Sequence, residues 1–228
     1  MNRLYIIGTG PGGLEHLSPI ARAALESCTD LAGHGLYLNL LGELAHGKIR
    51  HKTPMGEELA RATLALDLAA SGRTTALVSS GDAGIYGMAT VVFELLARKP
   101  KPEWATVEIE VIPGISAMQA AAARVGAPLA HDFCVISLSD LLTPWELIAK
   151  RIDLAGQGDF AIAFYNAVSN KRSWQLLEAR QTLLRYRQPD TPVIVAFNVT
   201  RKGEQITVTT LGDLDPEPLN MLSLVMVG

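Results

Sequence analysis

The sequence predicts an α/β protein with two α/β layers that share a cleft. Short apolar runs typical of buried strands alternate with segments of helical spacing in both halves of the chain. Glycine-rich loops follow several of these strands, where open α/β sheets place small ligands. Hydrophobic residues make up 48% of the 228 residues, which is ample for packed cores.

Composition excludes several classes of function. The formal net charge of −3 lacks the basic balance of a nucleic-acid-binding protein. Cys28 and Cys134 stand in separate segments without metal-ligand spacing. No stretch approaches the roughly 20 apolar residues of a membrane span, and the N-terminus lacks an apolar targeting core. We expect a soluble, cytoplasmic protein that binds no nucleic acid, membrane or metal.

The first half opens with a strand over 4–7 and a glycine-rich loop. Ser18 and Pro19 predict a helix start, because serine caps helices and proline suits the first helical position. Residues 33–52 are expected to be irregular. Their basic cluster at 48–52 is either a solvated connection or a wall facing an acidic substrate.

A second helix is expected to begin at Thr53 and Pro54 and to end at Gly72. It leads to a buried strand over 74–78, which is followed by a loop rich in glycine and serine. The next elements are a helix from 88 and an alternating strand over 106–111. Proline and glycine then break the pattern, so we expect an N-terminal α/β domain over 1–112 and a C-terminal one over 113–228.

The second half also alternates strands with helices, although the two halves show no obvious sequence repeat. Thr143, Pro144 and Glu146 form a capping-box pattern that predicts a helix start. The other expected elements are strands over 133–138, 159–165 and 192–197, a helix over about 173–187, and a closing pair of strands over 205–210 and 221–227.

The first loop matches the dinucleotide fingerprint G-x-G-x-x-G through Gly8, Gly10 and Gly13, so an NAD(P)-dependent oxidoreductase has to be weighed. Pro11 removes an N–H that such a loop needs, and the helix starts late. Asp30 stands near the distance of the required acid, but at the start of an apolar run and not at its end. The match is weak.

Three motifs together resemble the tetrapyrrole methylase family, the S-adenosylmethionine-dependent enzymes of corrin and sirohaem synthesis. They are G-x-G-P-G at 8–12, S-G-D-A-x-x-Y-G at 80–87 and P-G-x-S-A at 113–117. In this family Pro11 is expected. The resemblance extends over essentially the whole chain, and the order and spacing of the motifs make it specific.

The segment at 137–146 and the sequence after Phe164 resemble the precorrin-3B C17-methyltransferases within this family. Two positions depart from their usual pattern. Ala167 stands where proline is usual, and His34 stands where a G-Y-x-x-Y motif places its first tyrosine.

The resemblance implies two α/β domains, each with a mixed sheet flanked by helices, and a cofactor cleft between them. It implies methyl transfer from S-adenosylmethionine to C17 of precorrin-3B, with ring contraction to precorrin-4 and S-adenosylhomocysteine as the product. The cobalt-dependent step on cobalt-factor III is the alternative. A homodimer is also implied. The matching cofactor positions are Pro11, Gly81, Asp82, Ala83, Tyr86, Ser116, Ala117, Tyr165, Asn166 and Val199.

Several polar side chains near these loops have both a functional and a structural interpretation. Asp82 is expected to contact the cofactor, and the competing interpretation is a cap on the following helix. Ser116 has the same pair of alternatives. Lys171 with Arg172, and Arg201 with Lys202, follow strand ends, and we expect at least one pair to bind substrate carboxylates, because arginine holds such groups with paired donors. Solvation at a helix start or turn is the competing interpretation, above all for Arg201 and Lys202. No general acid or base is assigned; the polar loop residues that remain unranked are His34, His131, Asp132, Ser139 and Asp140.

Overall fold

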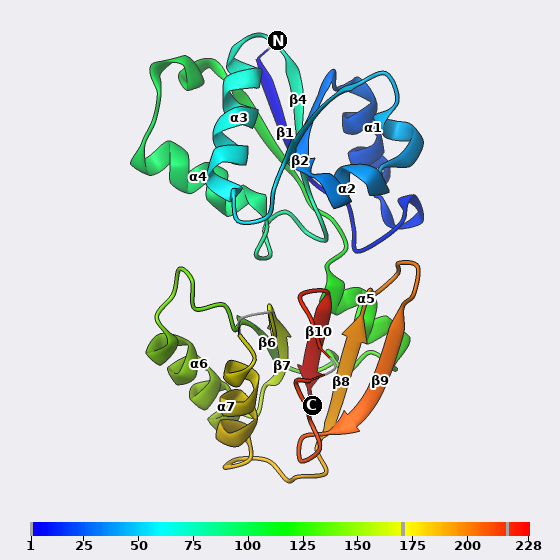
Figure 1. The fold of residues 1–228 in the computed structure, drawn as a ribbon, viewed down its shortest axis with the longest axis vertical. Helices are drawn as coiled ribbons and strands as arrows, with labels where there is room; N and C mark the ends of the chain where they lie inside the picture. The colour runs from blue at the N-terminus through cyan, green and yellow to red at the C-terminus, as the bar shows by residue number, and fades with distance from the viewer. Residues whose placement is uncertain (1, 170–171, 218) are drawn as a thin grey trace. The chain divides into compact units, whose positions relative to one another are not determined.

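A computed structural model describes residues 2–169, 172–217 and 219–228. The chain forms two compact units, Met1–Ser116 and Ala117–Gly228. Each unit contains one five-stranded sheet with helices packed against it (Figure 1). The predicted α/β class, with two sheets flanked by helices, is confirmed.

The sheet of the first unit has the strand order β3-β2-β4-β1-β5 and is parallel throughout. The expectation of a mixed sheet is therefore wrong for this unit. After every strand, a connection returns the chain to the same starting edge, which makes successive strands parallel. The elements are β1 (Arg3–Gly8), α1 (Pro19–Ser27), β2 (Asp30–His34), α2 (Gly35–Leu40), β3 (Ile49–Thr53), α3 (Glu58–Ala70), β4 (Thr74–Ser79), α4 (Met88–Arg98) and β5 (Glu108–Ile112).

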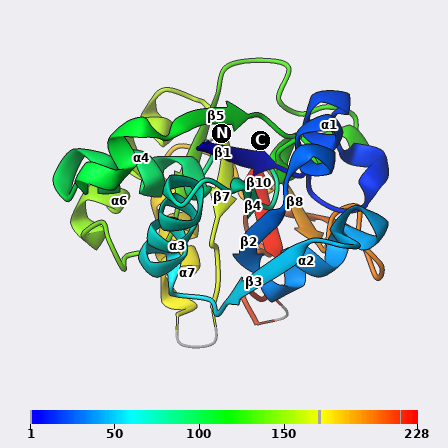
Figure 2. The ribbon, with the colours of Figure 1, turned by 90° about the horizontal axis from the view of Figure 1, so that it is seen from above.

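Helices cover both faces of this sheet, as the end-on view shows (Figure 2). Ile6 and Leu77 point to one face and join a buried cluster with α3 and α4. Ile7 and Val78, one residue further along each strand, point to the other face and join a cluster with α1 and α2. Because both faces are buried, these strands are apolar along their length.

Local sequence signals set two helix ends. Ser18 caps α1, because its Oγ accepts the backbone N–H of Ala21 at 3.2 Å. Gly72 follows α3 with a φ of +93°, where glycine is favoured. The expected helix start at Thr53 and Pro54 is wrong. Thr53 is the last residue of β3, and α3 begins five residues later.

The expectation of an irregular segment at 33–52 is also wrong. This segment contains α2 and the edge strand β3, which pairs in parallel with β2. Its register sets Asp30 beside Ile49 and His34 beside Thr53. The basic residues that gave the segment a loop-like composition instead lie along a sheet edge, where charge protects against pairing with other chains.

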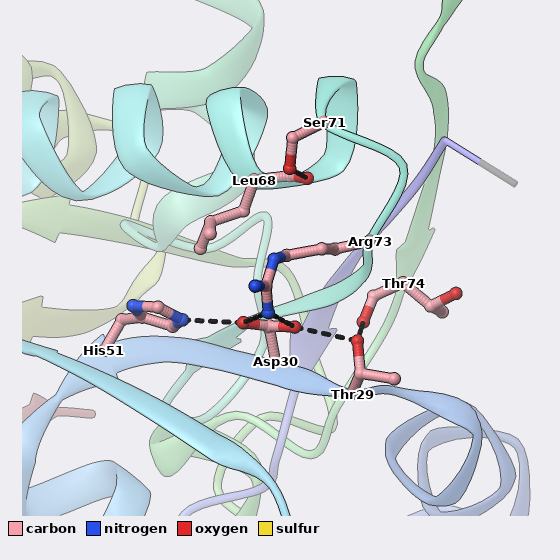
Figure 3. Close-up of polar contacts among 7 residues, drawn as sticks. All are labelled: Thr29, Asp30, His51, Leu68, Ser71, Arg73 and Thr74. Atoms are coloured by element: carbon pink, nitrogen blue, oxygen red, sulfur yellow. Dashed lines mark hydrogen bonds and ion pairs between the residues drawn. The ribbon is translucent and has the colours of Figure 1, made fainter.

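A buried carboxylate in β2 is bonded to β3 and to the residue before β4, near the amino edge of this sheet (Figure 3). Asp30 is fully buried and accepts hydrogen bonds from His51 Nε2 at 2.7 Å and Thr29 Oγ1 at 2.8 Å. Arg73 Nη1 lies 2.9 Å from both carboxylate oxygens. Burial alone would raise the pKa of Asp30, but these hydrogen bonds and the charge of Arg73 outweigh it and lower the pKa.

The second unit has a mixed sheet with the order β6-β7-β10-β8-β9. Strands β6 and β7 are parallel, and the remaining neighbours are antiparallel. One buried cluster packs α6 and α7 against the sheet. The elements are α5 (Ala117–Arg124), β6 (Phe133–Ser137), α6 (Trp145–Gln157), β7 (Ala161–Tyr165), α7 (Trp174–Leu183), β8 (Pro192–Phe197), β9 (Gln205–Thr210) and β10 (Ser223–Val227).

Two predictions for this unit need correction. The last two strands do not pair with each other, because β10 lies between β7 and β8 while β9 forms the edge beside β8. The capping box is also absent. Helix α6 begins at Trp145 with Pro144 at its N-cap and no side-chain cap, so Thr143 lies outside the helix.

Candidate functional site

Three loops leave the first unit's sheet from its carboxyl edge. Strands β1 and β4 end at the paired residues Gly8 and Ser79, and β5 ends at Ile112, which pairs with Ile7. The sheet is parallel, so the loops that follow these ends emerge side by side. They carry the three motifs found in the sequence.

Backbone hydrogen bonds connect the first two loops. Gly10 N donates to Gly81 O at 3.1 Å, and Gly81 N donates back to Gly10 O at 2.7 Å. Thr9 N donates to Ser79 O at 2.9 Å. Gly10 and Gly81 both have positive φ, which glycine adopts without strain. The loops are therefore held by main chain, and their glycines are required by conformation.

The third loop packs directly against the other two. A Cβ built on Gly114 would lie 2.6 Å from Gly8 O and would also clash with Gly81 O. One built on Gly8 would lie 2.7 Å from Gly114 N. No side chain fits between backbones at these distances, so glycine at positions 8 and 114 lets the three loops pack main chain against main chain.

Asp82 bridges two of the loops. Its Oδ1 accepts the N–H of Gly84 at 2.7 Å, and its Oδ2 accepts the N–H of Gly114 at 2.9 Å. The helix-cap alternative is wrong, since α4 begins at Met88 with Gly87 at its N-cap and no side-chain cap. One carboxylate oxygen thus fixes Asp82's own loop, and the other joins that loop to the one after β5.

The other cofactor-binding residues predicted in this unit lie in the same three loops that meet around Asp82. Pro11, Ala83 and Ser116 are buried. Tyr86 is 53% exposed and has a φ of +49°, an uncommon conformation for a residue with a side chain. The exposed, strained tyrosine in a loop of glycines is consistent with a ligand-binding role.

In the second unit, Tyr165 is the last residue of β7 and Asn166 follows it. The Tyr165 hydroxyl accepts the N–H of Met118 at 3.1 Å, in the first turn of α5 that Ala117 begins. Asn166 has a φ of +51°, and its Nδ2 donates to Ser137 Oγ at 2.9 Å. Val199 is buried between two residues of positive φ. Strained backbone is thus found at both predicted loops of this unit.

Arg172 connects the loops that follow β6 and β7. Its Nη1 donates to Leu138 O at 2.6 Å, and its Nη2 donates to Asn166 O at 3.3 Å. The carboxylate of Asp140 lies 3.8 Å away. These contacts commit part of the guanidinium to the protein itself. Lys171, the other predicted substrate ligand, lies outside the described residues.

Two side chains that the sequence reasoning missed also support the loops. Ser79 Oγ accepts the N–H of Met88 at 3.3 Å, at the first turn of α4. Thr9 Oγ1 donates to Ser79 O at 3.1 Å. The sequence signal for Ser79 is a serine at the end of a strand that leads into glycines. Its partner, Met88, lies nine residues later and cannot be identified from local sequence.

The dinucleotide alternative fails on geometry. Asp30 is the first residue of β2 and so lies at the amino edge of the sheet, opposite the Gly8 loop. It is also fully buried and bound by three side chains. It is therefore unavailable to a ribose at the glycine-rich loop.

Neither a metal cluster nor a membrane helix is found in the part of the chain that the structure describes. No group of three or more His, Cys, Asp and Glu side chains there is placed to hold a metal ion. None of the helices formed by those residues is both long and apolar enough to cross a membrane.

Comparison with known proteins gives a consistent result. The family model for tetrapyrrole (corrin/porphyrin) methylases matches residues 3–215. A probable cobalt-factor III C(17)-methyltransferase from Salmonella typhimurium is 46% identical, over 99% of this chain and 92% of its own length. A precorrin-3B C(17)-methyltransferase from a Sinorhizobium species is 42% identical, over 99% of this chain and 88% of its own.

Longer relatives match as well. The chain is 46% identical to a cobalt-factor III methyltransferase from Priestia megaterium over 99% of its own length, but it spans only 42% of that protein. Among solved structures, the methyltransferase CobJ superposes with a TM-score of 0.92 at 42% identity, covering 99% of this chain and 93% of the other. A uroporphyrin-III C-methyltransferase from Thermus thermophilus in complex with S-adenosylhomocysteine shares the fold, with a TM-score of 0.71 at 21% identity over 99% of this chain and 97% of the other.

Proposed function

This chain belongs to the tetrapyrrole (corrin/porphyrin) methylase family, and from that premise we propose that it methylates C17 of precorrin-3B. The methyl donor in this proposal is S-adenosylmethionine, and ring contraction to precorrin-4 accompanies the transfer. The observation that carries the proposal is near-complete coverage, at 42% identity, of a relative named for this reaction.

A second substrate is supported by a separate observation. Relatives from Salmonella and Priestia, each 46% identical, are named for cobalt-factor III. Both reactions methylate C17 and differ in whether the ring holds cobalt. Cobalt-factor III is therefore the alternative substrate of the same site.

The residues proposed to hold S-adenosylmethionine are those of the interlocked loops and of the β7 and β8 ends. The set suits such a ligand because Gly81 has no side chain and Ala117 has a single methyl group, so neither holds a ligand far from the main chain. Asp82 would act by fixing these loops, since its oxygens are occupied by Gly84 and Gly114. The set comprises Pro11, Gly81, Asp82, Ala83, Tyr86, Ser116, Ala117, Tyr165, Asn166 and Val199.

The bound cofactor supplies an already electrophilic methyl group, so the protein needs no nucleophile of its own. The loops' contribution is to orient the donor and exclude water. Positioning of reactants is worth up to roughly 7–11 kcal/mol of a barrier. Rigid loops joined by backbone bonds and by the Asp82 bridge suit that task.

The proposal also covers the contacts to the substrate, the compartment and the oligomeric state. Lys171 and Arg172 bind carboxylates of the tetrapyrrole in this proposal, Arg172 with the donor capacity left after its bonds to Leu138 and Asn166. The enzyme works in the cytoplasm as a homodimer. Sedimentation of the purified protein tests the dimer directly.

The proposed function is tested by binding and turnover. Calorimetry should show that S-adenosylhomocysteine binds while NAD and NADP do not. Incubation with S-adenosylmethionine and either metal-free precorrin-3B or cobalt-factor III should yield a product heavier by one methyl group. Turnover of cobalt-factor III alone would select the alternative substrate, whereas binding of a nicotinamide cofactor or turnover of neither tetrapyrrole would refute the proposal.

A further inference from the structure

The loop after β6 starts beside the candidate cofactor residues of the second unit. Strands β6 and β7 are parallel and pair Ser137 with Tyr165, so their carboxyl ends lie side by side. Leu138 N donates to Tyr165 O at 2.9 Å, and Asn166 Nδ2 donates to Ser137 Oγ. The loop of residues 138–144 therefore leaves the sheet next to Tyr165 and Asn166.

Side chains in α7 and just before it hold the base of this loop. Arg172 Nη1 donates to Leu138 O at 2.6 Å and lies 3.8 Å from the carboxylate of Asp140. Gln175 is buried, and its Nε2 donates to Asp140 Oδ2 at 3.1 Å. Both the main chain at Leu138 and the side chain of Asp140 are thus fixed.

The far end of the loop is anchored as well. Trp145 begins α6 and packs edge-on against Trp174, the first residue of α7, with 4.9 Å between ring centroids. The indole Nε1 of Trp145 donates to Glu178 Oε2 at 3.3 Å. The loop is therefore attached to the α7 region at both ends, so loose attachment does not explain an exposed side chain between them.

Two leucines between these anchors are exposed. Leu141 is 84% exposed and Leu142 is 98% exposed, and no other large apolar side chain that the structure describes has so high an exposed fraction. A single exposed leucine is ordinary, but two in succession on an anchored loop form an apolar surface that gains free energy when it is covered. Whatever covers this surface has to lie near the carboxyl ends of β6 and β7.

We propose that Leu141 and Leu142 contact the apolar macrocycle of the tetrapyrrole substrate. This inference rests on the proposed function and adds an apolar contact to the basic residues proposed above. Methyl transfer requires a ring carbon to reach the methyl group of the cofactor, so the macrocycle must lie beside the residues that hold the cofactor. The leucine loop starts next to two of those residues, Tyr165 and Asn166. A second copy of this chain is the competing occupant, and the test separates the two.

The test compares Leu141→Gln and Leu142→Gln with the wild-type enzyme. Glutamine is polar and similar to leucine in size, and both positions are exposed, so we expect both variants to fold. Each should raise the KM for the tetrapyrrole about tenfold and leave kcat and the Kd of S-adenosylhomocysteine unchanged. Leu154→Gln is the matched control, because Leu154 is an exposed leucine near the end of α6 away from this loop.

A conservative variant separates apolar contact from loop shape. Methionine is apolar and close to leucine in volume, so Leu142→Met should keep the KM near the wild-type value. The KM increase in Leu142→Gln should persist as ionic strength rises, because the substitution removes no charge. An increase in Leu142→Met as large as that in Leu142→Gln would overturn the inference.

Sedimentation of the same proteins tests the competing occupant. A wild-type dimer that dissociates in the glutamine variants would assign the leucines to a contact between copies and overturn the substrate assignment. A raised Kd for S-adenosylhomocysteine with an unchanged KM for the tetrapyrrole would also overturn it. An unchanged KM in both glutamine variants, with normal wild-type turnover, would overturn this inference alone. Absence of wild-type turnover would refute the proposed function and this inference together.

Discussion

Asp82 shows how one side chain organises the candidate site. The sequence placed it in a ligand-binding loop and left a helix cap as the competing role. The structure shows that its two oxygens hold the N–H groups of Gly84 and Gly114, one in its own loop and one in the loop after β5. The second contact spans 32 residues of sequence, so no local pattern reveals it.

Replacing Asp82 with alanine should loosen the loops. Two backbone N–H groups lose a charged acceptor, and leaving such groups unpaired costs about 1–3 kcal/mol. We expect the free energy of unfolding to fall by about 2 kcal/mol and S-adenosylhomocysteine to bind more weakly.

Urea denaturation and calorimetry measure these two effects. Asp190→Ala is the matched control, since Asp190 is exposed and no hydrogen bond or ion pair is described for it. Asp82→Asn retains one acceptor and should fall between wild type and alanine. Equal stability and affinity in all four proteins would show that the bridge contributes nothing.

Elements of the first unit are joined by the Asp30 network at the end of the sheet away from the loops (Figure 3). It connects β2 to β3 through His51 and to the residue before β4 through Arg73. The sequence identified Asp30 only as a poor match to a dinucleotide-binding acid and assigned residues 33–52 to a loop. Composition misled here, because an edge strand carries the charges that a loop also carries.

Replacing Arg73 with alanine should destabilise the protein at neutral pH, because Asp30 would stay buried with less compensation. Breaking a buried pair costs about 3–5 kcal/mol. The Arg73 side chain is 44% exposed, and screening by water reduces the loss to about 2 kcal/mol.

Lowering the pH should reduce the loss of stability that the Arg73→Ala substitution causes. The folded state lowers the pKa of Asp30 below its ordinary 3.8, so the network's stabilisation is present above that value and is lost as pH falls through the lowered one. Unfolding in urea at neutral pH and at pH values below 4 measures the effect, with the exposed Arg98→Ala as control. A wild-type advantage that stays constant with pH would contradict the role of an ionised Asp30.

At the scale of the whole molecule, the position of the boundary between the units has a physical consequence. The sequence predicts domains over 1–112 and 113–228, while contacts divide the chain after Ser116. Residues 113–116 carry Gly114, whose N–H is held by Asp82 and whose backbone packs on Gly8 and Gly81. These four residues are thus part of the first unit's packing.

A fragment of residues 1–116 should therefore be more stable than one of residues 1–112. The shorter fragment loses a charge-assisted hydrogen bond and the backbone packing around it, together worth about 2 kcal/mol. Thermal unfolding followed by circular dichroism compares the two. Identical midpoints would show that the loop after β5 adds nothing to the first unit.

The sequence by itself was sufficient for features that depend on neighbouring residues. Apolar runs located most strands, Ser18 and Pro19 located the start of α1, and the three glycine motifs identified the family and the loops of the candidate site. In each case the residues that signal the feature also form it, within one strand, one cap or one turn.

Only the tertiary structure decided which distant groups meet. It showed that Asp82 reaches Gly114, that Arg73 and His51 enclose Asp30, and that β10 lies between β7 and β8. Such contacts join residues from tens of positions apart. Their geometry follows from which strands lie side by side in a sheet, whereas periodicity along the chain gives only the face on which each residue lies.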